Sequence, residues 1–153
     1  MQYYPILITF HIVFAGMWLL NAIIDYRYRS KILSAEKGLL KNAYINDYLS
    51  TTNLVGILSS SGILITGVIM VLMMPHFGFF EFTANHWLVS KQIVFIAIYA
   101  VIFAMLIPAS KKLRAAENDE EQTGALKKVF SLQTTINVMV VLNFLFALSR
   151  HFM

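Results

Sequence analysis

Polar side chains inside long apolar stretches are the residues of this chain whose chemistry needs an explanation. His11 lies in an apolar stretch that begins near Tyr4, and Lys91 lies near the start of another. An imidazole at that depth can ligate a metal, relay a proton, or bond to a helix neighbour such as Asn143 or a serine; these alternatives stay open. The Lys91 ammonium can reach the membrane surface or pair with a ligand carboxylate.

His11 belongs to a polar stripe. His11, Trp18 and Asp25 recur at seven-residue spacing, which places them on one face of a helix. We expect this face to point toward other helices, because polar groups are costly in lipid. At its end, Asp25 is expected to form a solvated ion pair with Arg27 and Arg29 at the membrane surface.

The second apolar stretch carries a row of small residues followed by methionines. The small residues are Asn53, Gly56, Ser59, Ser60, Ser61, Gly62 and Gly67. They predict close approach of a neighbouring helix or of a flat ligand. A metal-binding set follows, comprising Met70, Met73, Met74 and His76. Thioether and imidazole groups suit Cu(I), so copper is an alternative metal, although methionine also fills gaps in apolar packing.

The composition requires elements that span a membrane. The chain is 58% hydrophobic, 13% charged and free of cysteine. Its apolar runs cover about 4–24, 52–74, 87–107 and 129–148, and each is long enough to cross a bilayer as a helix. We therefore predict an all-α, four-helix transmembrane bundle forming a single integral membrane domain over residues 1–153. The missing cysteine excludes thiolate ligands and covalent c-type haem.

Charge sets the expected orientation. The connection 75–86 has no lysine or arginine, whereas the connections before and after it are basic. By the positive-inside rule the basic connections are cytoplasmic, so both termini face outward (N-out/C-out). Within this frame, 34–47 is expected to form an interfacial helix before Asn46 or Asp47 caps the second span. Pro108 is expected to end or kink the third.

Several short motifs resemble those of HemJ-type protoporphyrinogen oxidases and of the related CopD-like copper-resistance domains, which are four-helix integral membrane proteins. The likeness covers nearly the whole chain as architecture, and its most specific element opens the third span. The motifs are Phe10-His11-Ile12, Trp18, Thr66-Gly67 and Trp87-Leu88-x-x-Lys91.

The resemblance implies a b-type haem inside the bundle. It makes His11 the axial ligand, with Lys91, Trp18, Trp87 and Arg27 serving the cofactor site. It further implies oxidation of protoporphyrinogen, with electrons passed to the respiratory chain.

The leading hypothesis is a haem-b protein of electron transfer or porphyrin(ogen) oxidation, in the inner (cytoplasmic) membrane of a bacterium. Its expected surroundings are the lipid bilayer, a respiratory-chain or quinone partner, and a homo-oligomer or larger membrane complex, with no nucleic acid. Two other functions stay open. One is copper handling at the outer face; the other is a non-catalytic subunit or assembly factor of a larger complex.

Overall fold

The chain forms four long helices. The computed structural model describes residues 3–74, 78–81 and 86–149. Its elements are α1 (Tyr4–Ser34), α2 (Leu39–Met73), α3 (His86–Val101), η1 (Ile102–Leu106), α4 (Ile107–Ala115) and α5 (Asp119–Ser149), with α3, η1 and α4 following one another as a single rod. All four rods are long and apolar enough to cross a membrane, and no strand occurs in the described ranges. The predicted all-α four-helix membrane bundle is confirmed, and the chain is an integral membrane protein.

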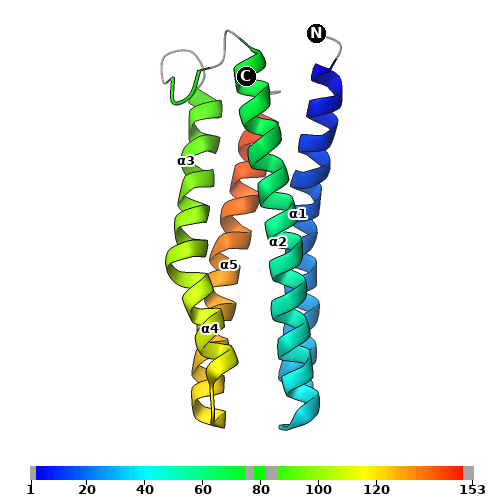
Figure 1. Cartoon of the computed structure of the whole chain (residues 1–153), viewed down its shortest axis with the longest axis vertical. Helices are drawn as coiled ribbons and strands as arrows, with labels where there is room; N and C mark the ends of the chain where they lie inside the picture. The colour runs from blue at the N-terminus through cyan, green and yellow to red at the C-terminus, as the bar shows by residue number, and fades with distance from the viewer. Residues whose placement is uncertain (1–2, 75–77, 82–85, 150–153) are drawn as a thin grey trace.

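The helices extend well past the apolar runs at one end of the bundle. α1 has 31 residues, which at 1.5 Å per residue gives about 46 Å, against about 30 Å for a hydrocarbon core. The start of α1 and the end of α5 lie together, at what we call the terminal end (Figure 1). The short connections 35–38 and 116–118 lie at the opposite, loop end. The extra helical turns, and most of the basic residues, are at the loop end.

The interfacial helix expected within 34–47 is not formed. α2 begins at Leu39, directly after Gly38, whose φ of 127° suits a glycine. Asn46 and Asp47 lie inside this helix and cap nothing. The early turns of α2 are held in place because they bury side chains such as Tyr48 in the core.

Pro108 does not end its helix. It lies near the start of α4, immediately after the π-helical turn η1. The Ile107 amide donates to the Ile102 carbonyl, the wider spacing of a π turn. Because proline lacks an amide hydrogen and crowds the preceding turn, this turn absorbs the disruption, and the helix continues to Ala115.

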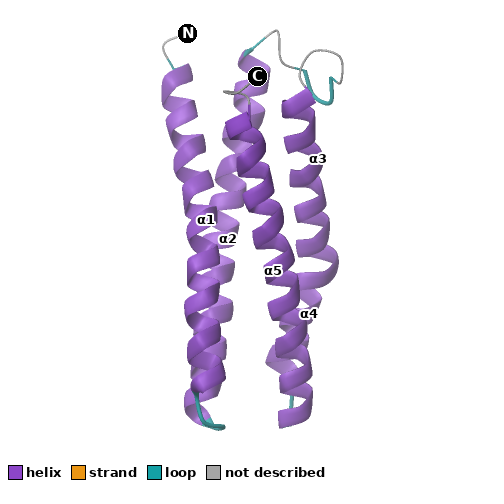
Figure 2. Cartoon of the chain, turned by 180° about the vertical axis from the view of Figure 1, so that it is seen from behind, coloured by secondary structure: helices purple, strands orange, loops and turns teal. Residues whose placement is uncertain are grey.

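The four rods pack as two pairs. α1 packs mainly on α2, and α3 with α4 packs mainly on α5, while α1 and α5 join the pairs; Figure 2 shows the same pairing from behind. The core lies in the loop half and the middle of the bundle. Its loop-half cluster includes Ile32, Tyr48, Leu113 and Val129. The middle cluster is built around Trp18, Ile98, Ile136 and Val140.

The small-residue row of α2 is the surface on which α1 packs. A Cβ added at Gly62 would collide with the ring of Phe14, and one added at Gly56 would lie 3.8 Å from Asn21 Nδ2. Trp18 and Asp25 of the polar stripe are buried, as is Asn21 beside them. The predicted inward direction of the stripe is confirmed, and these small residues serve helix packing.

Candidate functional site

A cavity of about 380 Å³ lies at the terminal end, between the two helix pairs. All four rods contribute to its walls. The core clusters that hold the two pairs together lie farther along the bundle, toward the loop end. Its volume lies within the usual range for small-molecule sites. The residues that matter to its chemistry are His11, Gly67, Met70, Trp87, Lys91, Phe95 and Asn143. We call this the terminal cavity.

A threonine of α2 sets the protonation of His11. His11 Nδ1 lies 2.8 Å from Thr66 Oγ1, and the Thr66 hydroxyl donates to the Gly62 carbonyl at 2.6 Å. Since the hydroxyl proton is directed at that carbonyl, Oγ1 accepts from the imidazole, and Nδ1 carries the hydrogen. Nε2 is therefore left with a lone pair, as needed to ligate a metal or accept a proton.

Gly67 leaves room for the His11 imidazole against α2. A Cβ at this position would lie 3.4 Å from His11 Cε1, at the near limit of ordinary contact. Thr66 thus accepts a hydrogen bond from the imidazole, and Gly67, which has no side chain, lets the ring lie close to the α2 backbone. The helix-neighbour bond anticipated for His11 exists, but the partner is Thr66; the proposed Asn143 and serine partners were wrong.

Lys91 and Trp87 line the same cavity from α3. Lys91 Nζ lies 5.7 Å from the centroid of the Trp87 ring, within reach of a cation–π contact. Among the described lining residues there is no carboxylate. The cavity is therefore lined by the Lys91 side chain and the His11 imidazole within largely apolar walls.

An unsatisfied oxygen adds a further polar group. Asn143 of α5 lines the terminal cavity, and its Oδ1 is buried without a hydrogen-bond partner in the structure. Buried polar atoms are nearly always paired with protein, water or ligand. The Asn143 amide oxygen is thus available to a donor that occupies the cavity.

Two of the five cofactor residues anticipated from sequence lie elsewhere. Trp18 is 3% exposed, in the core below the cavity, where its ring meets Phe95 edge-on at 5.9 Å. Phe95 lines the cavity, so Trp18 supports its floor. Arg27 is exposed and lies sixteen residues from His11, about 24 Å along α1. The structure thus brings together His11, Lys91 and Trp87, but neither Trp18 nor Arg27.

The alternative copper set is only partly described. Met70 lines the terminal cavity together with His11. Met73 is 38% exposed and does not line it. Met74 follows the end of α2, and His76 lies outside the described residues. Across the described ranges, no three histidine or carboxylate side chains gather in a way that would hold a metal ion.

The buried network around Asp25 was missed from sequence. The expected ion pair of Asp25 is formed with Arg29, but Asp25 is 4% exposed, so the expectation of a solvated pair was wrong. Its carboxylate accepts from Arg29 through both oxygens at 2.8 Å, from Tyr48 at 2.7 Å and from Asn137 at 3.1 Å. Arg29 also donates to the Phe130 carbonyl at 2.6 Å. This network joins α1, α2 and α5. The exposed Arg27 forms none of these hydrogen bonds.

The fold and site define an integral membrane four-helix protein with a largely apolar cavity between its helix pairs, into which a few polar side chains project. No protein-family model, no curated protein and no solved structure matches the chain. The likeness to HemJ-type oxidases and CopD-like domains therefore stays a resemblance of short motifs.

Proposed function

We propose that the chain binds a b-type haem in the terminal cavity and serves electron transfer or porphyrin(ogen) oxidation. The observation that carries the proposal is His11, whose Nε2 lone pair is set by the bond from Nδ1 to Thr66. Metal-bound histidines in proteins commonly donate their other nitrogen to such an acceptor. Haem, when bound, supplies one-electron chemistry.

The donor set suits a metal that arrives already held by a macrocycle. One imidazole is enough to fix a haem iron, whereas a non-haem site needs several protein ligands. The chain has no cysteine, so attachment is non-covalent. Met70 lines the same cavity and would be the candidate for a second ligand of the iron.

The cavity walls suit a flat amphiphile that enters from the bilayer. Ile12, Leu64 and Ile96 line the cavity, yet they are among the exposed hydrophobic residues that would face lipid. An apolar ring system can therefore pass between the helix pairs without crossing water. Lys91 would pair with a carboxylate of the ligand, and the apolar walls would exclude water around it.

The decisive measurement is a reduced-minus-oxidised visible spectrum of the purified protein, expressed with ample haem precursor. We expect a Soret band and stoichiometric haem in the wild type. The band should be lost in His11→Ala and retained in His86→Ala, the matched control at the exposed start of α3. Added imidazole should restore the band in His11→Ala, which separates lost ligation from lost folding. A folded wild type without a Soret band overturns the proposal.

Copper is the second candidate, favoured by the presence of Met70 beside His11 in one cavity. A soft thioether–imidazole pair suits Cu(I). Elemental analysis of the same preparation distinguishes the two: haem predicts iron that depends on His11, and copper handling predicts copper that falls when Met70 becomes leucine. A protein that holds neither metal and co-purifies with stoichiometric partners would instead be a structural subunit.

A further inference from the structure

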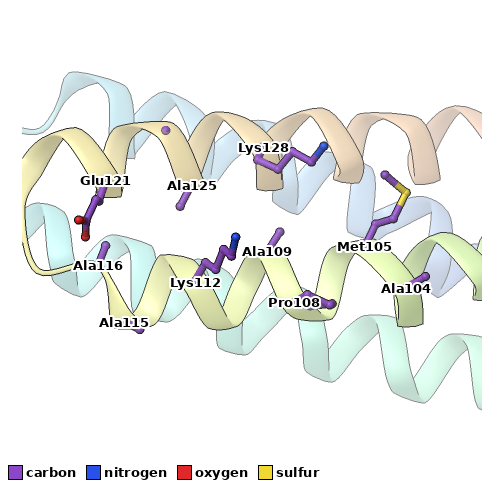
Figure 3. A pocket seen from close by; sticks show the side chains of 11 residues that line it. Ala104, Met105, Pro108, Ala109, Lys112, Ala115, Ala116, Glu121, Ala125 and Lys128 are labelled. Atoms are coloured by element: carbon purple, nitrogen blue, oxygen red, sulfur yellow. The ribbon is translucent and has the colours of Figure 1, made fainter.

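A second hollow lies near the loop end, whereas the terminal cavity lies toward the other end of the bundle. It is a groove of about 710 Å³ between η1–α4 and α5. Small residues on both rods leave the space between them unfilled, and Figure 3 shows Ala109 and Ala125 pointing into it from the two rods. Gly124 adds to the room, because a Cβ there would meet nothing within 4 Å.

The groove crosses the boundary between apolar and charged sequence. Ala104 and Met105 lie at its deeper end, inside the apolar run 87–107. Lys112 lies about 12 Å farther along the helix, beyond that run. Lys128 of α5 lies just before the apolar run that starts at Val129. With the apolar runs taken as the hydrocarbon core, the groove has an apolar part at acyl-chain depth and a basic part near headgroup depth.

The charge within the groove is net positive. Lys112 and Lys128 come from the two facing rods, and the lining contains one carboxylate, Glu121. Neither lysine forms an ion pair among the residues that the structure describes. The positive-inside rule predicts that this end meets the cytoplasmic leaflet, where anionic lipids are concentrated.

We propose that this groove binds one anionic phospholipid, with the headgroup phosphate between Lys112 and Lys128 and an acyl chain along Ala104 and Met105. Each lysine near an anionic surface contributes to such binding, and two from facing helices fix the position of the phosphate. The inference is independent of what occupies the terminal cavity.

The test is native mass spectrometry of the detergent-purified full chain with phosphatidylglycerol or phosphatidylcholine of identical acyl chains. We expect wild type to retain phosphatidylglycerol preferentially. Lys112→Gln/Lys128→Gln should weaken that binding about 30-fold, the loss expected for two phosphate contacts. Lys111→Gln/Lys127→Gln has the same net charge but changes neighbours outside the groove, and it should keep the binding.

A groove-filling variant tests the apolar half. Gly124→Leu keeps both lysines, and its side chain extends into open space, so it should abolish lipid retention without unfolding the protein. Equal loss in the two lysine pairs would show general surface charge and overturn the proposal. Displacement of the lipid by inorganic phosphate alone would overturn it too. So would a dimer that Gly124→Leu dissociates and that carries no lipid.

Discussion

At the scale of single residues, Thr66 controls the chemistry of His11 without reaching the cavity itself. Its hydroxyl donates within α2 and accepts from the imidazole across the helix interface. Because it fixes which ring nitrogen carries the hydrogen, Thr66 is a positioning residue for whatever Nε2 binds.

Thr66→Val should weaken haem binding by about 10- to 100-fold, the usual cost of losing such a partner, and should shift the reduction potential. Thr66→Ser keeps the hydroxyl and should restore both. Thr52→Val is the matched control, since Thr52 is also buried in α2 and donates to a backbone carbonyl at 2.7 Å. Titration with haem and a potentiometric titration measure the effects. Equal changes in Thr66→Val and Thr52→Val would assign Thr66 a purely structural role.

Sequence identified His11 and Lys91 because depth in an apolar run can be read from the chain, and the motif resemblance added Trp87. The structure places all three in one cavity. The partners of Asp25 could not be found in that way. Tyr48 and Asn137 lie 23 and 112 residues from it. Only the packing of three helices brings these groups together. In the buried network, protein groups take the place of the water molecules that we expected around Asp25 from the sequence.

At the scale of helices, the α1–α2 contact depends on the fit of an aromatic ring against a glycine. The Phe14 ring occupies the space that a side chain at Gly62 would need. The sequence predicted this small-residue surface, but not which helix would use it, because the same pattern serves a ligand or any neighbour.

Gly62→Ala should destabilise the protein by about 1–3 kcal/mol, as overpacking does in a close-packed interior. Gly16→Ala is the control: a Cβ there meets nothing within 4 Å, so the change should be neutral or stabilise α1 by up to about 1 kcal/mol through helix propensity. Thermal unfolding in detergent, followed by circular dichroism, measures both. Similar shifts for the two variants would show that the Phe14 contact is not tight.

The positions of the spans were predictable, whereas the full lengths of the helices were not. Hydropathy detects only the part of a helix that lies in lipid. The turns that α1 and α2 add at the loop end are mixed in composition, and they are helical because residues such as Ile32 and Tyr48 pack into a shared core. The π turn before Pro108 is a further local feature of this kind. The proline predicts that the helix is disturbed near this position, but not that the disturbance takes the form of a π turn.

At the scale of the whole molecule, the two ends differ in charge and in what they enclose. The loop end carries the closely packed core, the basic residues and the groove of Lys112 and Lys128. The terminal end encloses the cavity with His11 and Lys91. If the positive-inside rule fixes the orientation, the cavity opens toward the outer leaflet and the groove toward the inner one.

This orientation can be tested cleanly, because the chain has no cysteine of its own. Tyr3→Cys places a thiol at the terminal end, and Glu36→Cys places one in the connection between α1 and α2; both positions are exposed. In intact cells, a membrane-impermeant maleimide should label Tyr3→Cys at once and Glu36→Cys only after permeabilisation. The reverse pattern would put His11 on the cytoplasmic side and the paired lysines of the groove outside. The lipid proposal would then lose its argument from the charge of the leaflet, whereas the haem proposal, which rests on the geometry of His11 and Thr66, would stand unchanged.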